Sequence, residues 1–295
     1  MKAKVLSIVW VAVFMLVLVG GPSPAAETTD RVVVTVAAVG DIVCRPGDRT
    51  NACKDAATAN LIRHRGVGGL FTLGDNQYED GTLSQFQNGY DSTYGPFKPF
   101  TYPSPGNHEY HTPGASGYFD YFGSRARRGP PGYYAFTLNG WRVYSLNTNC
   151  DKINCAAQRT WMVKNVAANP ALCQAMYMHY SRYSSDTRSG SIIPKRFWTV
   201  GVNNGFELAL GGHDHYYERF ARMNASGDVT GAGMQSFVVG TGGKDLDVFG
   251  PTTTGSRARY SRFGVLFLTL SPIGYKWDFR TITNTSRDSG SRTCR

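Results

Sequence analysis

The stretch Gly212-His213-Asp214-His215-Tyr216-Tyr217-Glu218-Arg219 is the most informative part of this chain, and it closely follows an apolar run over 206–210. Side chains two positions apart in an extended segment lie on the same side, so His213 and His215 can reach one ligand or two neighbouring ligands. An isolated His-x-His pair is weak evidence for such a site. The pair is stronger evidence in this chain, because four of its six histidines lie in short motifs that contain residues able to bind a ligand.

The same arrangement, an apolar run that ends at a residue able to bind a ligand, occurs at three earlier points. Short apolar or β-branched runs bounded by glycine are typical of buried strands, and glycine lets the backbone turn sharply where such a strand ends. We therefore predict strands over 31–39, 69–73, 175–178 and 206–210, which end at Gly40-Asp41, Gly74-Asp75, His179 and Gly212-His213.

Segments with helical spacing of apolar residues lie between these strands. The run 55–65 ends at Gly66, and the run 156–168 stops before Pro170, as helices do. Further strands are predicted over 236–239, 263–270 and 274–282. The second of these lacks apolar–polar alternation, so both of its faces should be buried. Alternating strands and helices predict an α/β (α+β) domain with helix-covered sheets, which binds ligands at the carboxyl ends of its strands.

The N-terminal segment 1–26 has the features of a secretory signal peptide. Two lysines precede a nearly unbroken apolar run over 5–19, and small residues follow it. A membrane anchor is the alternative, but these fifteen residues fall short of the roughly 20 that span a bilayer. We expect cleavage near Ala25 or Ala26, and a secreted, extracellular protein with no membrane attachment once the signal is removed.

The six cysteines all follow the expected cleavage point, and disulfides are the usual state of cysteines in an exported chain. Six cysteines allow fifteen pairings. A thiolate metal site would need Cys-x-x-Cys spacing, which the sequence lacks. Closeness along the chain favours the pairs Cys44–Cys53 and Cys150–Cys155, which leaves Cys173 and Cys294.

The formal net charge of +10 becomes +8 when Lys2 and Lys4 leave with the signal. Excess positive charge attracts anionic substrates over long distances. No basic helix or aromatic stacking platform accompanies it, so we expect no specific nucleic-acid partner. The sequence carries no indication of the oligomeric state.

No repeat or linker divides the remainder of the chain, so we expect one main domain over 31–283. The stretch 284–295 is rich in Ser, Thr and Gly. We expect this C-terminal tail to be loose unless Cys294 ties it down.

Asp41 and Asp75 each follow a glycine at a predicted strand end. A lone Gly-Asp is more often a helix cap or a turn, but two at matching strand ends favour a carboxylate pair that holds two cations, with one carboxylate bridging them. Asn107, in Gly106-Asn107-His108-Glu109, offers a carbonyl oxygen that suits a divalent ion with other anionic ligands. Two adjacent metal ions are well suited to phosphate esters, because both neutralise phosphoryl oxygens.

His108 is expected to lie over the substrate rather than bind metal, where its imidazole can hydrogen-bond a phosphoryl oxygen or the leaving group. Glu109 would then orient the neighbouring ligands. We expect His64 and His111 to be ordinary surface or loop residues.

Five motifs, in their order along the chain, resemble those of the calcineurin-like metallophosphoesterase superfamily, over Val32 to about Phe279. They are Gly40-Asp41, Gly74-Asp75-Asn76-Gln77-Tyr78, Gly106-Asn107-His108-Glu109, His179 and Gly212-His213-Asp214-His215. The resemblance implies a four-layer sandwich of two packed mixed β-sheets flanked by helices. It also implies that the domain over 31–283 is a catalytic metallophosphoesterase domain.

Two positions are similar to the purple acid phosphatase branch of that superfamily. Val43 stands where many other members have histidine, and Tyr78 lies three residues after the second aspartate. The resemblance implies one metal position formed by Asp41, Asp75, Tyr78 and His215, and a second formed by Asp75, Asn107, His179 and His213. A phenolate is a hard, anionic ligand, so it favours Fe(III) at the first position. A divalent ion (Fe, Zn or Mn) is expected at the second.

The chain departs from the branch at one point. Arg188 stands nine residues after His179, where better-known members have a further histidine. Arginine can bind a phosphoryl group but cannot donate a proton. We therefore expect His108 to be the general acid, with a metal-bound water as the alternative. Arg182 and Arg188, with Asn107 and His108, are candidates for substrate binding, although solvated loop arginines are the simpler interpretation.

The sequence thus predicts a dinuclear, metal-dependent phosphoesterase that hydrolyses small phosphate monoesters by metal-bound hydroxide, as acid phosphatases do. A phosphodiesterase or nucleotidase of the same fold is the nearest alternative. A secreted metal- or phosphate-binding protein without turnover is a further one.

Overall fold

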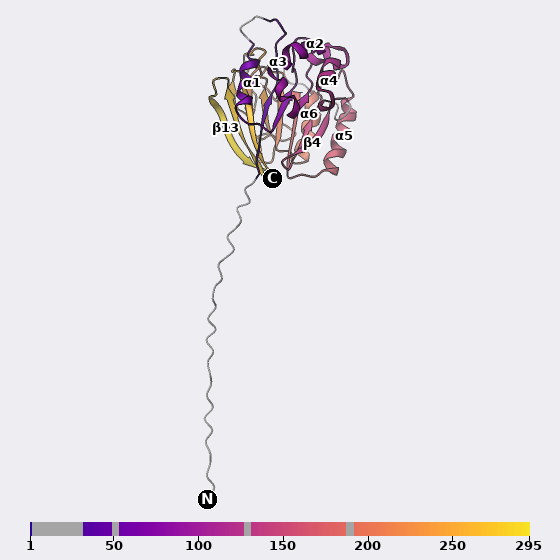
Figure 1. Cartoon of the computed structure of the whole chain (residues 1–295). Helices are drawn as coiled ribbons and strands as arrows, with labels where there is room; N and C mark the ends of the chain where they lie inside the picture. The colour runs from indigo at the N-terminus through magenta and orange to yellow at the C-terminus, as the bar shows by residue number, and fades with distance from the viewer. Residues whose placement is uncertain (2–31, 49–52, 127–130, 187–191) are drawn as a thin grey trace. The chain divides into compact units, whose positions relative to one another are not determined.

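The computed structural model describes residues 32–48, 53–126, 131–186 and 192–295, together with Met1. The chain divides into two units, Met1–Arg31 and Val32–Arg295, and the fold lies in the second (Figure 1). The predicted signal peptide, apart from Met1, and the predicted phosphate ligand Arg188 lie outside the described residues. None of the described helices is long and apolar enough to cross a lipid bilayer.

Six strands form the first sheet, and in their order across it they are β13 (Ser286–Thr293), β12 (Gly274–Thr281), β11 (Gly264–Ser271), β1 (Val34–Val39), β2 (Gly69–Leu73) and β3 (Thr101–Ser104). The last three are parallel to one another, whereas β11, β12 and β13 pair antiparallel. The sheet is therefore mixed.

Seven strands form the second sheet, and in order they are β10 (Ser256–Tyr260), β8 (Tyr217–Phe220), β9 (Gln235–Val239), β7 (Leu208–Gly212), β6 (Cys173–Tyr180), β5 (Trp141–Ser145) and β4 (Tyr134–Leu138). The central strands β9, β7, β6 and β5 are parallel. The strands β4, β8 and β10 are antiparallel to their neighbours, so this sheet is mixed as well.

The two sheets pack face to face around a shared apolar core. Aromatic side chains meet across the interface: the rings of Phe71 and Tyr177 stack at 5.1 Å, and those of Tyr217 and Phe279 at 3.9 Å. Strands in this position have one face against the other sheet and one against helices. Both faces are apolar, so their sequences read as continuous apolar runs rather than alternating ones.

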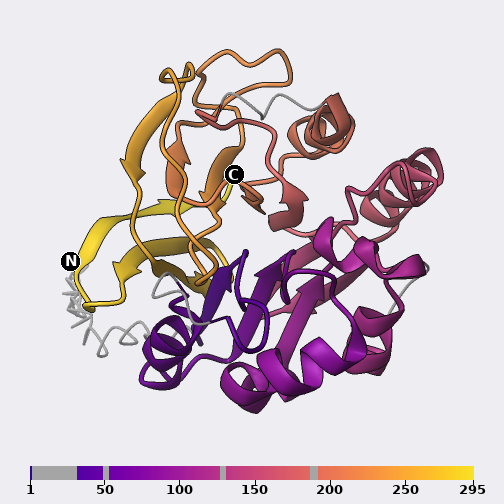
Figure 2. The same ribbon diagram turned by 90° about the horizontal axis from the view of Figure 1, so that it is seen from above.

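Helices cover the outer faces of both sheets (Figure 2). The first sheet carries α1 (Asp55–Arg63), η1 (Phe86–Tyr90), η2 (Gly95–Phe100) and α4 (Ser116–Phe122). The second sheet carries α5 (Cys155–Ala168) and α6 (Ile192–Asn203). Short helical turns complete the described elements: α2 (Leu83–Gln85), α3 (Asp91–Thr93), η3 (His108–His111), η4 (Pro113–Ala115) and η5 (Gly123–Arg125). The predicted four-layer α/β (α+β) sandwich is confirmed.

The predicted strands at the ligand motifs are present, as β1, β2, β6 and β7. The segment 263–270, predicted to be buried on both faces, is β11. Its residues alternate between the core that separates the sheets and the core beneath the helices. The helices predicted over 55–65 and 156–168 are α1 and α5.

All three disulfides join the predicted pairs: Cys44–Cys53, Cys150–Cys155 and Cys173–Cys294. The last of these ties the C-terminal segment to β6. Residues 286–293, within the segment expected to form a tail, pair along β12 as the edge strand β13. Main-chain hydrogen bonds to β12 organise this polar segment, which has no apolar pattern of its own.

Candidate metal centre

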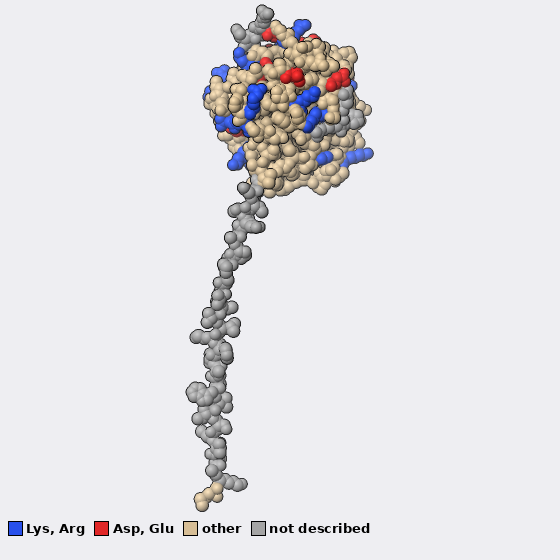
Figure 3. All heavy atoms as spheres, viewed as in Figure 1, with Lys and Arg blue, Asp and Glu red and all other residues tan. Residues whose placement is uncertain are grey.

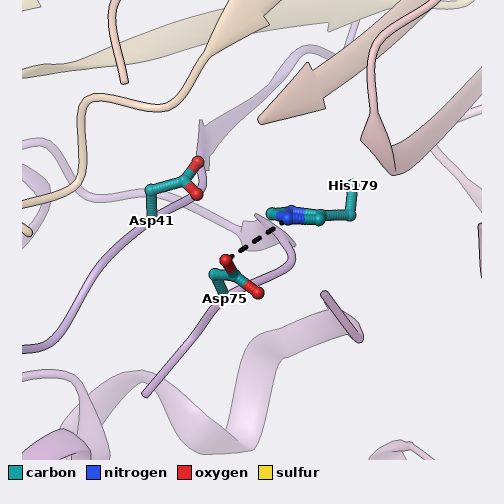
Figure 4. Close-up of side chains that lie close together, drawn as sticks. All are labelled: Asp41, Asp75 and His179. Atoms are coloured by element: carbon teal, nitrogen blue, oxygen red, sulfur yellow. Dashed lines mark ion pairs between the residues drawn. The ribbon is translucent and has the colours of Figure 1, made fainter. Parts of the chain in front are cut away.

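The carboxyl ends of four strands bring predicted ligands together. Asp41 follows β1, Asp75 follows β2, His179 lies near the end of β6, and His213 follows β7. Donor atoms of Asp41, Asp75 and His179 all lie within 4.8 Å of one another, and the three side chains are buried (Figure 4). Two buried carboxylates this close need positive charge beside them.

The backbone at these strand ends takes a conformation that residues other than glycine rarely adopt. Asp41, Asp75 and His213 have φ angles of 59°, 46° and 72°, and each such residue costs about 1–3 kcal/mol. Gly106 lies so close to the second aspartate that an added Cβ would be 2.1 Å from its Oδ1. The fold therefore holds these turns in a strained arrangement that directs their side chains into one site.

Tyr78 lies at the centre of the first predicted set of ligands. Its hydroxyl oxygen is 3.0 Å from Asp41 Oδ1, 3.1 Å from Asp75 Oδ2 and 3.1 Å from His215 Nε2. A phenol has a single proton and cannot donate to both carboxylates at once. Burial and the two aspartates raise the pKa of Tyr78 well above its usual value. A cation among these atoms would reverse that shift and stabilise the phenolate.

His179 lies at the centre of the second predicted set. Its Nε2 is 2.9 Å from Asn107 Oδ1, 3.3 Å from Asp75 Oδ2 and 3.3 Å from His213 Nδ1. Its Nδ1 donates to the main-chain carbonyl of Leu73 at 3.0 Å. This hydrogen bond leaves the lone pair of Nε2 for the other ligands, as in histidines that bind metal.

The two imidazoles of this set differ in their protonation. Burial lowers the pKa of His179, but the carboxylate of Asp75 outweighs burial and raises it to about 9. Burial and the nearby His179 lower the pKa of His213 to about 4. One proton on the pair thus excludes a second. A metal ion would take the place of that proton and bind both rings in their neutral form.

The carboxylate of Asp75 belongs to both sets, since Oδ2 lies 3.1 Å from the Tyr78 hydroxyl and 3.3 Å from His179 Nε2. Although burial acts in the opposite direction, His179 holds the pKa of this carboxyl well below its usual range. The oxygen and imidazole donors around it fit two transition-metal ions that share one carboxylate. Ligation itself remains a prediction.

Glu109 holds the loops of the centre together. Its buried carboxylate accepts hydrogen bonds from the main-chain N–H groups of Asp75, Asn76, Gln77 and Gly106, at 3.1, 2.7, 3.2 and 2.6 Å. Burial and Asp75 raise the pKa of Glu109 to about 7. The residue thus holds these main-chain segments in place, and its role in orienting metal ligands remains a prediction.

His108 lies at the edge of the centre, with its ring centroid 4.3 Å from that of Tyr78 and its Nε2 3.9 Å from Asp75 Oδ2. Its Nδ1 donates to the Glu79 carbonyl at 2.6 Å, so Nε2 is the nitrogen that faces the ligands. His111, expected to be an ordinary loop residue, contacts the same carbonyl at 2.8 Å and lies 4.5 Å from His108. The short helical turn η3 brings the two rings together.

The guanidinium group of Arg182 lies over the ring of Tyr183, at 4.6 Å from its centroid. This contact is what a partly exposed loop arginine commonly makes. The roles of Arg182 and Arg188 in substrate binding therefore remain predictions.

A loop over 242–247 adds residues that sequence reasoning missed. Asp245 accepts a hydrogen bond from His215 Nδ1, and Asp247 accepts one from the main-chain N–H of the same histidine at 2.9 Å. The Lys244 ammonium lies 5.2 Å from the ring centroid of Tyr78. The loop follows β9, but nothing in the local sequence relates Asp245 to His215, which lies 30 positions earlier.

No protein-family model matches the sequence, and no curated protein matches it. Solved structures do match. A purple acid phosphatase, PPD1 from yellow lupin (Lupinus luteus) seeds, superposes with a TM-score of 0.70 at 20% identity, over 89% of this chain and 54% of that chain. The present chain thus spans about half the length of the lupin chain.

Two further structures match at similar coverage. GAP50, described as the anchor in the inner membrane complex of Plasmodium, has a TM-score of 0.66 at 15% identity, over 89% of both chains. PhoD has a TM-score of 0.58 at 14% identity, over 88% of this chain and 68% of that one. At such identities the likeness concerns the fold. The chain therefore has the fold that the resemblance of its motifs implies, and it shares that fold with the purple acid phosphatase and PhoD.

Proposed function

We propose that this chain is a secreted, extracellular phosphoesterase that works with two metal ions and hydrolyses small phosphate monoesters, as acid phosphatases do. The observation that carries the proposal is the position of Asp75. Its Oδ2 lies 3.1 Å from the Tyr78 hydroxyl and 3.3 Å from His179 Nε2, which belong to the two predicted donor sets. Three disulfides agree with export. The likeness to a purple acid phosphatase supports the choice of reaction.

The two donor sets favour different ions. Tyr78 and Asp41, with Asp75 and His215, would hold Fe(III), because a phenolate is a hard, anionic ligand. Asn107, His179 and His213, with the shared carboxylate, would hold a divalent ion (Fe, Zn or Mn). When bound, such ions acidify a water molecule and neutralise the oxygens of a phosphate ester.

The residues around the ions supply position and protons. The side chain of Asn107, whose Oδ1 lies 2.9 Å from His179 Nε2, would also hydrogen-bond the substrate. His108 would hydrogen-bond the leaving oxygen through Nε2, since the Glu79 carbonyl fixes its other nitrogen. Glu109 holds the segments that follow β2 and β3 together, because its carboxylate accepts hydrogen bonds from four of their main-chain N–H groups. Figure 3 shows Lys and Arg side chains spread over the viewed face, which agrees with attraction of an anionic substrate.

The first test is Asp75→Ala. This variant should lose both metal content and hydrolysis of p-nitrophenyl phosphate, whereas Asp120→Ala, an exposed aspartate on α4, should retain both. Full activity in Asp75→Ala would overturn the proposal. Bis(p-nitrophenyl) phosphate and a nucleotide, assayed in parallel, separate a monoesterase from a diesterase or nucleotidase of the same fold.

The role of His108 requires a test of its own. A general acid contributes about 10²–10⁴-fold, and the contribution is largest for poor leaving groups. His108→Gln should therefore slow hydrolysis of an alkyl phosphate far more than that of p-nitrophenyl phosphate. Equal loss on both substrates would assign proton donation to another group.

A second candidate function is metal binding without turnover. The likeness to GAP50, which is described as an anchor, favours it. Metal content without hydrolysis of any ester in the panel would support this alternative.

A further inference from the structure

The loop over 242–247 is attached to the strands that carry the first donor set. The main-chain N–H of Gly242 donates to the Gly40 carbonyl at 2.9 Å, and that of Lys244 to the Asp41 carbonyl at 3.2 Å. The N–H of Asp247 donates to the His215 carbonyl at 3.0 Å. These bonds hold the loop in one position relative to two predicted ligands.

Two of the three histidines that are predicted as ligands, His215 and His179, have outer partners of different charge. His215 donates from Nδ1 to the carboxylate of Asp245, whereas His179 donates from Nδ1 to the neutral carbonyl of Leu73. In both rings Nε2 faces the centre. When the hydrogen-bond partner of one ring nitrogen is a carboxylate rather than a carbonyl, the other nitrogen is a stronger electron-pair donor to a metal ion. The difference therefore adds negative charge to the donor set that already contains the phenol.

The same loop also contacts the second distinctive ligand of that set. Lys244 lies 5.2 Å from the ring centroid of Tyr78, and its ammonium pairs with Glu79 at 2.5 Å. One loop thus contacts both Tyr78 and His215, two of the residues that belong to the first donor set and not to the second.

We infer that Asp245 is a positioning residue, which fixes the ring of His215 and makes the Tyr78/His215 position the one that takes the more highly charged cation. This inference rests on the proposed two-metal function and deepens it. Asp245 acts through the histidine, and the partly exposed carboxylate, with 55% of its side chain accessible, need not touch substrate or metal.

The test is Asp245→Asn, prepared with iron and zinc beside the wild-type protein. The asparagine keeps an acceptor for His215 Nδ1 but removes the charge. We expect iron affinity, measured by chelator competition, to fall about 10–100-fold while zinc content is retained. We also expect the tyrosinate–Fe(III) absorption band to shift, and Asp245→Glu to restore both properties.

The matched control is Asp247→Asn, because Asp247 accepts a hydrogen bond from the main-chain N–H of His215 at 2.9 Å, whereas Asp245 accepts one from the imidazole of that histidine. It should leave iron affinity and the band unchanged. An Asp245→Asn protein identical to wild type, or one that loses both metals equally, would overturn the inference. Circular dichroism verifies that each variant is folded. A wild-type protein that binds no metal would overturn the proposed function itself, whereas a metal-loaded wild type with an unaffected Asp245→Asn overturns the inference alone.

Discussion

Two buried acids of this molecule are neutralised in different ways. Glu207 and Asp41 both have 0% of their surface exposed. Glu207 pairs with the guanidinium groups of Arg222 and Arg295. Asp41 instead faces a phenol hydroxyl at 3.0 Å and an imidazole nitrogen at 3.4 Å. In the described part of the chain, no Lys or Arg forms an ion pair with it.

The difference separates a structural ion pair from a predicted binding site. A guanidinium group keeps its protons at any working pH, so Glu207 is permanently satisfied from within the chain. Phenol and imidazole can both give up a proton and become metal ligands. The carboxylates of the metal centre are thus surrounded by groups that can bind an external cation. Glu207 is surrounded by guanidinium groups, which cannot.

Removal of the metal ions should give the largest change in activity. It affects the carboxylates of the metal centre and leaves Glu207 with its arginine partners intact. Metal ions supply several kcal/mol of transition-state stabilisation, so treatment with a chelator should lower hydrolysis of p-nitrophenyl phosphate by at least about 10³-fold. Added iron and zinc should restore it. Undiminished hydrolysis by protein shown to be metal-free would mean that the site around Asp41 is no more a metal site than the ion pairs of Glu207 are.

Glu207→Gln should produce the opposite pattern. Breaking a buried ion pair costs about 3–5 kcal/mol, because the remaining charges lose their partner. We expect the free energy of unfolding in urea to fall by that amount, with metal content per folded molecule unchanged. A loss of metal in this variant, or a change in stability below about 1 kcal/mol, would contradict the structural role.

Tyr78→Phe tests whether the phenol of the centre is a ligand. Removal of the hydroxyl that lies 3.0 Å from Asp41 and 3.1 Å from His215 should abolish the tyrosinate–Fe(III) band and weaken iron binding by at least about 10-fold. Visible spectra and iron analysis of the two proteins measure this. A wild-type protein that is colourless yet fully active would place a different ion at this position.

Tyr217→Phe is the matched control, with the smallest expected effect. The Tyr217 hydroxyl donates to Asp288 at 2.6 Å, but Arg219 also pairs with that carboxylate, at 2.6 and 3.0 Å. Loss of one such hydrogen bond should lower the free energy of unfolding by about 1 kcal/mol, and the visible spectrum should not change. A spectral change here would mean that the band reports general packing rather than Tyr78.

Much of the centre could be predicted because its ligands lie next to features that local sequence reveals. Asp41, Asp75 and His213 follow apolar strands that end in glycine, and parallel strands present their carboxyl ends at a common edge. The disulfide pairs could be predicted for a similar reason, because two of the three join cysteines that are only 9 and 5 positions apart in the sequence.

The missed parts depend on contacts between distant segments. The strand Ser286–Thr293 contains no apolar residue, so only its pairing with β12 reveals it. Asp245 lies 30 positions after His215, and nothing local relates the two. His111 looks like a loop residue until a helical turn places its ring beside that of His108.

By itself, the sequence determined the α/β class, the strand ends that carry ligands and the identity of the donor atoms, because these follow from local periodicity and residue chemistry. Only the tertiary structure decided that Asp245 accepts a hydrogen bond from His215 and that His215 and His179 have outer partners of different charge. Those facts depend on which strands lie side by side and on how loops from two sheets meet, and neither can be derived from residue order alone.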